Sequence, residues 1–502
     1  MTARHTVCLQ PIGVQHQVEH NTALRDILTN YGFEFPCNGK GTCGKCKIRL
    51  IAGNIETDKR HEDLLYQRKL SLEWRFACHS RITEDVTIYI DRSDCVVQTD
   101  SSYFNILPEE GYGIAIDLGS TTLAVQLVNL QNGHIEAEQT ALNPQSTFGA
   151  DIISRIAHAI SSPAHSRQLT SLARQAIQHL IENLLVEHSY DIRKVVIVGN
   201  SVMHHLFCGI DVSPFAAYPY ISSHNEMRRF TPQELSWDLP ANCEITFLPN
   251  ISHFVGSDIL SGIEAVGMLG KEHYQALIDL GTNGEIAIGN RHKILCTSTA
   301  AGPAFEGVHI SQGMRASTGA IYQIDETGKS IGVIGNVSPI GICGSGLIDA
   351  IHLFLKQGQI DYSGTLLTED TDFLPICEGI GLTDKDIREY QLAKAAICTG
   401  IEILRRELNI SMKDIEHIYI TGGLGNYLNI EKAMNTGLLE IDCMEQVIKM
   451  SNSALLGARM FLFKEKQKNV TKILEVTQHC PLESHYDFQD IYCEKLFFSV
   501  GY

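Results

Sequence analysis

Four stretches of the chain are β-like runs of apolar residues that end in a turn of small or polar residues. They are GIAIDLGSTT (113–122), KVVIVGNSV (194–202), ALIDLGTNG (276–284) and HIYITGGLGNYL (417–428). A helix with an apolar stripe precedes the second run, and the stripe consists of Leu169, Leu172, Ala176, Leu180 and Leu184. Strands that alternate with helices in this way predict an α/β architecture for the large C-terminal part of the chain.

The first 92 residues follow a different pattern. Two β segments flank Pro11, and Leu24, Ile27, Leu28 and Tyr31 share one face of a short helix. A polar, turn-rich stretch begins at residue 93 and indicates a linker. We therefore expect a small domain at 1–92, a linker at 93–110, two lobes at 111–275 and 276–440, and a C-terminal helix and tail at 441–502 that pack back on the lobes.

Length and charge narrow the class of protein. A chain of 502 residues is too long for one small domain. Residues 1–92 carry 13 Lys and Arg against 11 Asp and Glu, whereas the remainder carries 27 against 47, and the net charge of −18 argues against nucleic acid as the main partner. No stretch approaches about 18 uninterrupted apolar residues and the first residues lack an apolar signal core, so we expect no membrane span and a cytoplasmic location.

Four of the 15 cysteines have the spacing of a metal site. Cys37, Cys43 and Cys46 lie on a glycine-rich loop with the spacing C-x5-C-x2-C, and Cys78 follows from a separate segment. Such a set can ligate two irons with two thiolates each, which predicts a [2Fe-2S] cluster. A four-cysteine zinc site would show two C-x2-C pairs. A phosphate loop, which GKGTCGK resembles at its start, would need Ser or Thr where Cys46 stands.

Residues 1–92 resemble [2Fe-2S] ferredoxins of the β-grasp type, with a cysteine loop like that of adrenodoxin. Four basic residues surround the loop: Lys40, Lys45, Lys47 and Arg49. They form either an ordinary solvated loop or a docking patch for an acidic redox partner.

The large C-terminal part contains an internal repeat. Asp117 and Asp279 are 162 positions apart, and each ends an apolar run as Asp-Leu-Gly followed by a small polar residue. A carboxylate at a strand end can hold Mg²⁺, and the turn after it offers N–H groups and hydroxyls to phosphate oxygens. The predicted phosphate-binding residues are Gly119, Ser120, Thr121, Thr122, Gly281, Thr282, Asn283 and Gly284. The glycine-rich turn after the fourth run would let an adenosine lie against the backbone of Gly422, Gly423, Gly425 and Asn426.

This order of motifs resembles the acetate and sugar kinase/heat-shock chaperone/actin superfamily. The resemblance implies an α+β multidomain protein in which the β-grasp [2Fe-2S] ferredoxin domain precedes a two-lobed α/β ATPase, actin-like or sugar kinase-like, with duplicated mixed sheets. The whole combination resembles the reductive activators of corrinoid enzymes. Four local patterns carry that resemblance: NPQSTFGADIISRI (143–156), VGNSVMHHL (198–206), AAGPAFEG (300–307) and GICGSGLIDAI (341–351).

The resemblance implies a cofactor set and a cycle. One electron from a low-potential donor would pass through the cluster to Co(II) of a partner corrinoid protein and regenerate Co(I) in a methyltransferase system. Plant-type clusters lie near about −400 mV. The cobalt couple is expected to be lower, and each ~100 mV costs about 2.3 kcal/mol, so ATP with Mg²⁺ must be coupled to the transfer. Related proteins suggest a homodimer. The cobalt would sit in the partner, because Ile251 stands where a corrinoid carrier has Asp before its His-x-x-Gly.

The residues that act on ATP follow from the same reasoning. Asp117 and Asp279 would organise Mg²⁺ and could position the attacking water. Gln145 and Glu306 could orient that water or sense the terminal phosphate, or they could line the cleft as structural residues. The loop GICGSG (341–346) either lines the nucleotide pocket or only starts a helix.

Other functions remain open at this point. The main alternative is a small-molecule kinase whose ferredoxin domain senses redox state, with Asp151 as its base. Another is a pure electron carrier in which the large unit is a docking platform, and a third is a dehydratase or reductase activator of the same superfamily.

Overall fold

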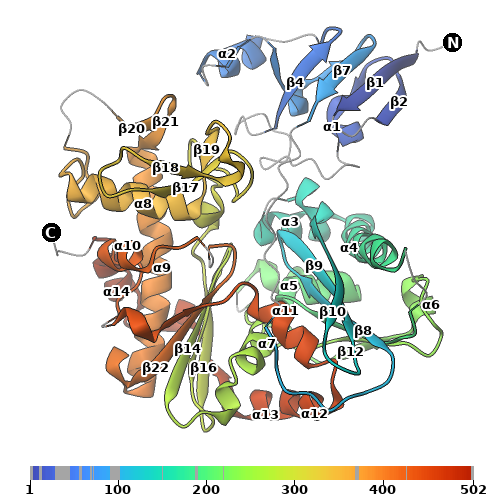
Figure 1. Cartoon of the computed structure of the whole chain (residues 1–502), viewed down its shortest axis with the longest axis vertical. Coiled ribbons are helices and arrows are strands. Elements are labelled where there is room, and N and C mark those ends of the chain that lie inside the picture. Colours follow the sequence, from blue (N-terminus) through green and yellow to red (C-terminus); the bar gives the residue numbers. More distant parts are fainter. Residues whose placement is uncertain are drawn as a thin grey trace. The chain divides into compact units, whose positions relative to one another are not determined.

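The computed structural model describes residues 4–10, 14–28, 46–55, 59–67, 70–71, 73–90, 102–149, 151–186, 190–218, 220–367, 372–424, 427–441 and 443–498. The chain forms two compact units (Figure 1). The first contains Met1–Asp94 and Leu142–Ala173, and the second contains Cys95–Ala141 and Arg174–Tyr502. Each unit is described by itself.

The first unit is built on a five-stranded sheet with the order β2-β1-β7-β4-β5. These strands are β1 (Arg4–Gln10), β2 (Val14–Glu19), β4 (Lys47–Ala52), β5 (Trp74–Phe76) and β7 (Val86–Tyr89), with β3 (Thr22–Ala23) and β6 (Arg81–Ile82) as a small separate pair. The predicted β segments on either side of Pro11 are confirmed as the antiparallel pair β1 and β2. Because side chains alternate between the two faces of a strand, Val7 and Leu9 enter the core from β1.

Two helices accompany this sheet, α1 (Leu24–Leu28) and α2 (Lys59–Gln67). Leu24, Ile27 and Leu28 of α1 are buried, as the apolar stripe predicts, whereas Tyr31 lies outside the described residues. The remaining elements of this unit are a short 3₁₀ helix (Pro144–Thr147), α3 (Ile152–Ser161) and the first half of α4 (Pro163–Leu185).

The second unit holds two six-stranded mixed sheets. Five strands follow the same order in both, β10-β9-β8-β11-β13 and β16-β15-β14-β22-β23, and the sixth strand, β12 or β24, lies at opposite edges. The first runs β10-β9-β8-β11-β13-β12 and the second β24-β16-β15-β14-β22-β23. The first sheet comprises β8 (Tyr112–Leu118), β9 (Thr122–Asn129), β10 (Ile135–Leu142), β11 (Ile192–Val198), β12 (Arg228–Phe230) and β13 (Glu244–Phe247). The second comprises β14 (Tyr274–Leu280), β15 (Gly284–Gly289), β16 (Ile294–Thr299), β22 (Ile415–Thr421), β23 (Val447–Lys449) and β24 (Thr477–His479).

The pairing confirms the duplication that the two Asp-Leu-Gly turns predict. Strand β8 is antiparallel to β9 and parallel to β11, and β14 is likewise antiparallel to β15 and parallel to β22. The two aspartates occupy matching register positions, since Asp117 lies beside Val198 of β11 and Asp279 lies beside Thr421 of β22. Each sheet therefore presents its aspartate at the carboxyl end of a central strand.

Helices α7 (Ser257–Ala265) and α11 (Ser453–Met460) pack directly on each other between the two sheets (Figure 1). Gly457 allows this approach, because a Cβ at that position would overlap the carbonyl oxygen of Ser261. One apolar cluster contains residues of both helices together with Ala115 of β8 and Leu277 of β14. The two lobes thus share a core centred on this helix pair.

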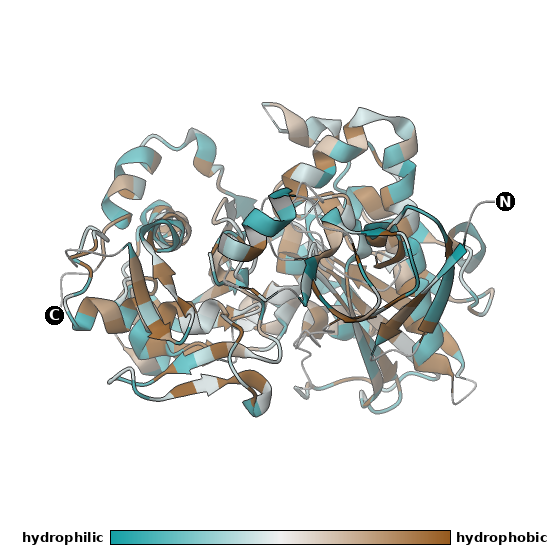
Figure 2. Cartoon of the chain, turned by 90° about the horizontal axis from the view of Figure 1, so that it is seen from above, coloured by the Kyte–Doolittle hydropathy of each residue, from teal (hydrophilic) through white to brown (hydrophobic). Residues whose placement is uncertain are grey.

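The second sheet carries additional elements. They are the three-stranded sheet β18 (Ile331–Val333), β17 (Ala320–Ile324) and β19 (Gly341–Ile342), the hairpin β20 (Phe373–Cys377) and β21 (Ile380–Thr383), and the helices α8 (Gly344–Lys356), α9 (Asp384–Leu408), α10 (Ile430–Asn435) and α14 (Phe488–Lys495). The other helices of the unit are α5 (Ser201–Cys208), α6 (Pro232–Leu235), α12 (Lys464–Gln467) and α13 (Asn469–Val476). Apolar residues concentrate in the central strands, which are largely brown in Figure 2.

The segment 102–110, the second half of the expected linker, lies against the rest of the second unit. Leu107 N–H donates to Glu465 at 3.0 Å, and Glu109 forms an ion pair of 2.5 Å with Lys194 of β11. The chain after residue 440 contributes β23 and β24 to the second sheet, which places it within the fold. The domain boundaries expected from the sequence stay predictions. None of the helices in the described part of the chain has the length and apolarity needed to cross a bilayer.

Candidate functional site

A single cleft in the second unit collects the turns that follow β8, β14 and β22. Residues of both lobes line this cleft, from the turn after β8 to Asn452 at the start of α11. Most of the predicted residues line it: Asp117, Gly119, Ser120, Thr121, Thr122, Asp279, Gly281, Thr282, Asn283, Glu306, Gly422 and Gly423. The fold therefore brings together residues that are about 300 positions apart in the sequence.

One predicted residue of the phosphate turns is placed differently, and two of the glycine turn cannot be compared. Gly284 is not among the residues that line the cleft, because it begins β15 and packs against Ile397 and Thr299. Gly425 and Asn426 fall outside the described residues.

Gln145 lies in the segment Leu142–Ala173 of the first unit, whereas the cleft belongs to the second. Its side chain is fully buried. Its Nε2 donates to the carbonyl of Leu169 at 2.9 Å, and its Oε1 accepts from Arg155 Nη1 at 3.4 Å. These bonds hold the amide within its own segment, and a role for Gln145 at the nucleotide stays a prediction.

The two phosphate turns are tight hairpin connections. Gly119 N–H donates to the carbonyl of Thr122 at 3.0 Å, and Gly281 N–H donates to the carbonyl of Asn283 at 3.2 Å. The first bond spans three positions and the second spans two, but both start at the glycine that follows Asp-Leu, so both lobes present small side chains and backbone groups at corresponding turns. Such turns are suited to binding phosphate oxygens.

Four carboxyl groups line the cleft: Glu285 is buried, and Asp117, Asp258 and Asp279 are partly buried. Burial raises the pKa of Asp117 to about 6, and burial together with the neighbouring Asp258, Asp117 and Glu306 carboxylates raises that of Asp279 to about 7. Burial and the nearby negative charges also raise the pKa values of Asp258 and Glu285. Several carboxylates in one partly buried place repel one another unless a cation joins them.

These oxygen donors suit Mg²⁺, which prefers carboxylate and phosphate oxygens and retains several waters. Among the described residues no three such side chains lie close enough to ligate one ion by themselves, so phosphate oxygens and water would complete its shell. Asp258 and Glu285 were missed by the motif reasoning. Asp258 is the second residue of α7, where an acidic residue is common in any helix. Glu285 did leave a signal, since it is the one charged residue in the otherwise apolar, buried strand GEIAIG.

Glu306 connects the two phosphate turns. Thr121 Oγ1 donates to Glu306 Oε2 at 3.2 Å, and Thr282 Oγ1 donates to Glu306 Oε1 at 2.6 Å. One carboxylate thus accepts hydrogen bonds from both hydroxyls that the sequence assigns to phosphate.

The glycine turn after β22 closes another side of the cleft. Gly422 has φ +92°, and a Cβ there would lie 2.5 Å from Asp279 Oδ1. A glycine is therefore required beside the aspartate. Cys343, Gly344 and Ser345 also line the cleft at the start of α8, so the loop GICGSG both starts a helix and contributes to the pocket.

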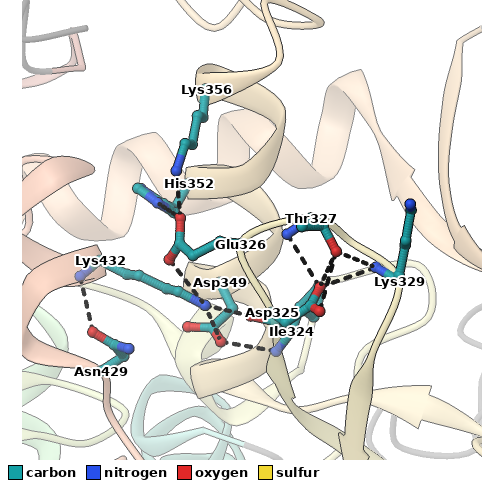
Figure 3. Close-up of polar contacts among 10 residues, drawn as sticks. All are labelled: Ile324, Asp325, Glu326, Thr327, Lys329, Asp349, His352, Lys356, Asn429 and Lys432. Carbon is teal, nitrogen blue, oxygen red and sulfur yellow. Dashed lines mark hydrogen bonds and ion pairs between the residues drawn. The ribbon is translucent and has the colours of Figure 1, made fainter.

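A buried ion pair fixes α10, which follows the glycine turn, against α8 (Figure 3). Lys432 Nζ lies 2.9 Å from Asp349 Oδ2, and both side chains are almost fully buried. Asp349 also accepts from Ile324 N–H at 2.9 Å, and Lys432 Nζ donates to the Ile324 carbonyl. Both charged groups hydrogen-bond to the backbone of Ile324 as well as to each other, and together they join α8, α10 and β17.

The first unit brings two of the four predicted cluster ligands together. Cys46 Sγ and Cys78 Sγ are 3.1 Å apart, well beyond a disulfide bond of about 2.05 Å. A backbone hydrogen bond of 2.9 Å from Ala77 N–H to the Cys46 carbonyl holds the two segments in place. Two adjacent thiols suit an iron–sulfur cluster. Cys37 and Cys43 lie outside the described residues.

The basic surroundings of the cysteine loop are only partly described. Arg49 pairs with Glu73 at 3.2 Å, and the Lys47 ammonium lies 5.9 Å from the centre of the Trp74 ring. Arg49 is therefore locally neutralised, which weakens the case for a strongly basic docking patch. Lys40 and Lys45 lie outside the described residues.

Comparison with known proteins gives a separate match for each of three parts of the chain. Three family models match: a 2Fe-2S iron-sulfur cluster binding domain at residues 9–83, the RACo middle region at 112–271, and the C-terminal domain of RACo, the ASKHA domain, at 273–501. The corrinoid activation enzyme RamQ of Eubacterium limosum is 31% identical over 412 residues, which cover 76% of this chain and 69% of that protein.

A second relative and one solved structure also match most of the chain. The [Co(II) methylated amine-specific corrinoid protein] reductase of Methanosarcina barkeri is 26% identical over 435 residues, 78% of each chain. A solved structure described as a reductive activator for corrinoid, iron-sulfur protein aligns with a TM-score of 0.70 at 26% identity and covers 98% of both chains. The chain belongs to the RACo family of corrinoid protein activators.

Proposed function

We propose that this protein is an ATP-dependent reductive activator that returns Co(II) of a partner corrinoid protein to Co(I) with one electron, within a methyltransferase system. The observation that carries the proposal is the cleft in which four carboxyl groups meet two hydroxyl-bearing turns, in a chain that also pairs Cys46 with Cys78. A nucleotide site and a one-electron site in one chain are what ATP-driven reduction requires. The related activators support the choice of substrate.

Each part of the chain has a proposed role. Cys37, Cys43, Cys46 and Cys78 would hold the [2Fe-2S] cluster, which supplies reversible one-electron storage when bound. Asp117 and Asp279, with Asp258 and Glu285, would bind Mg²⁺ directly or through water. The turn residues from Gly119 to Thr122 and from Gly281 to Asn283 would hold phosphates, and the turn from Gly422 to Asn426 would hold adenosine.

Glu306 is proposed as a sensor of the terminal phosphate. In the described structure it accepts from Thr121 and Thr282, one from each lobe. ATP would take over these donors and release the carboxylate, whose charge also repels phosphate. Because the two hydroxyls belong to different lobes, this exchange changes how the lobes are joined. A ligand that binds the two arrangements differently can drive a change in partner binding.

We further propose a low-potential electron donor, a homodimer and a cytoplasmic location, where thiols stay reduced. The alternative small-molecule kinase is less well supported. Its candidate base, Asp151, caps α3 by accepting from Ser154 N–H at 2.7 Å, so the carboxylate already has a structural task.

The test combines the purified protein, Ti(III) citrate as reductant and a Co(II) corrinoid protein, with and without ATP. We expect Co(I) absorbance only with ATP. The D117N variant should form no Co(I) even when ATP is present. The matched D191N variant, at an exposed carboxylate that pairs with Arg193, should behave like the wild type. C78S should lose reduction while it retains ATP binding. Equal Co(I) with and without ATP would contradict the proposed role of the nucleotide.

A further inference from the structure

The charges that line the nucleotide cleft are strongly unbalanced. Five carboxylates line it: Asp117, Asp258, Asp279, Glu285 and Glu306. Among the described residues that line the cleft, Arg315 is the one basic side chain. ATP brings further negative charge, and Mg²⁺ offsets only part of it. An arginine in such a place is positioned for an anion.

The backbone around Arg315 is held rigidly. Met314, its neighbour, donates its N–H to the Ile342 carbonyl at 2.9 Å, and Ile342 N–H donates to the Gln312 carbonyl at 2.9 Å. Ile342 ends β19 and leads directly into Cys343–Ser345, which line the same cleft. Arg315 therefore belongs to a strand-like segment fixed beside the start of α8.

Arg315 and Glu306 stand at the two ends of one loop whose base is closed by glycines. Gly307 has φ +72°, and a Cβ there would overlap the backbone of Met314. A Cβ on Gly313 would in turn overlap the carbonyl oxygen of Gly307. The outer part of the loop is tied to α9, since Ser311 N–H donates to Asp386 at 2.6 Å.

This closure has a chemical consequence. Glu306 accepts from the hydroxyls of both phosphate turns, so the base of the loop lies at the phosphate end of the cleft. Arg315 follows Met314 at the other end of the same loop and also lines the cleft. A guanidinium offers several N–H donors in a fixed planar arrangement that matches phosphate oxygens, and its charge is permanent.

We propose that Arg315 contacts the terminal phosphate of bound ATP and stabilises the negative charge that develops there during hydrolysis. In that step a water oxygen bonds to the terminal phosphorus and the bond from phosphorus to the bridging oxygen breaks. ADP leaves with the bridging oxygen, and the protons of the water pass to the released phosphate and to solvent. This inference deepens the proposed function and rests on it, because it concerns the same nucleotide site.

The test compares the steady-state hydrolysis of ATP by R315Q, R315K and wild-type protein, with equilibrium binding of ADP and of ADP with aluminium fluoride. We expect kcat of R315Q to fall about 10²–10³-fold. The affinity for ADP with aluminium fluoride should fall by a similar factor, whereas the affinity for ADP should change about threefold or less. R315K should lose less than R315Q, because it keeps the charge but not the planar set of donors.

The control is R229Q at an exposed arginine of β12 that pairs with Glu244, which should match the wild type. Thermal unfolding checks that each variant is folded. If R315Q does not fold, the comparison of R315K with the wild type serves as the test. An R315Q enzyme with wild-type turnover would overturn the assignment, as would an equal loss of ADP affinity and turnover. Wild-type protein that neither binds nor hydrolyses ATP would instead contradict the proposed function itself.

Discussion

Asn452 Nδ2 donates a hydrogen bond of 2.9 Å to Asp117 Oδ2, across 335 positions of sequence. The same side chain caps α11, because its Oδ1 accepts from Leu455 N–H at 2.8 Å. One amide therefore orients the aspartate of the first lobe and fixes the start of the helix that crosses α7. The hydrogen bond also lowers the pKa of Asp117, against the stronger effect of burial.

The double role of Asn452 can be separated by mutation. We expect N452A to lose about 1 kcal/mol of unfolding free energy with its cap. Turnover of ATP should also fall about 10–100-fold because Asp117 is no longer oriented. The matched control is N429A, since Asn429 caps α10 by accepting from Lys432 N–H at 3.1 Å and does not line the cleft. Denaturant unfolding and steady-state hydrolysis are the measurements. Equal turnover in the two variants would show that Asn452 is only a cap.

The buried carboxyl groups predict an unusual pH dependence of stability. The pKa of Asp279 rises from 3.8 to about 7 on folding, so the folded chain binds an extra proton between these values. Its contribution to stability is therefore complete below about pH 4 and is lost as the pH rises through about 7. We expect the metal-free wild type to lose stability relative to D279N between about pH 4 and pH 7, with little further change above that.

Thermal unfolding across that range, without Mg²⁺, measures the difference between wild type and D279N. D191N serves as the control at an exposed carboxylate. Mg²⁺ with ADP should stabilise the wild type more at about pH 8 than at about pH 6, because the carboxylates must lose their protons to bind the metal. A difference between wild type and D279N that does not change with pH would contradict the burial of an ionisable Asp279.

The ion pair between Lys432 and Asp349 should be costly to break at one end. Removing one partner leaves a buried charge without its counter-charge, so K432M should lose about 3–5 kcal/mol of unfolding free energy. The double variant K432M/D349L should recover much of this loss. K356M is the matched control, because Lys356 pairs with the exposed Glu326 at 2.7 Å and should cost about 0–1 kcal/mol. Additive losses in the double variant would show that the two charges do not interact.

Gly422 should be intolerant of any side chain. In G422A the Cβ would meet Asp279 Oδ1 in a backbone conformation with φ +92°. We expect the affinity for Mg²⁺ with ATP to fall about tenfold or more, because the aspartate must move. G358A is the control: Gly358 also has positive φ, +65°, but a Cβ there has open space. Isothermal calorimetry should therefore find nearly normal nucleotide affinity in G358A. Similar losses in both variants would point to general strain.

The local patterns in the sequence determined much of the fold class and of the site. The two Asp-Leu-Gly turns, the glycine turn after the fourth run and the cysteine spacing are each short segments whose chemistry is complete within about ten residues. The repeat of one such turn predicted duplicated sheets, and β8 and β14 occupy equivalent positions in them. Cys78 was predicted as the fourth ligand from chemistry alone, since a cluster needs a fourth thiolate, and its sulfur lies 3.1 Å from that of Cys46.

Only the tertiary structure decided which distant groups converge on the cleft. Four of these groups come from separate segments of the chain: Asp258, Glu285, Arg315 and Asn452. None of them belongs to a sequence motif that identifies which other residues it lies near. Their proximity depends on strand pairing between β8 and β11 and between β14 and β22, and on the packing of α7 against α11. Such contacts are set by the burial of apolar surface over the whole lobe pair. A local sequence window contains no information on which polar groups that burial brings together.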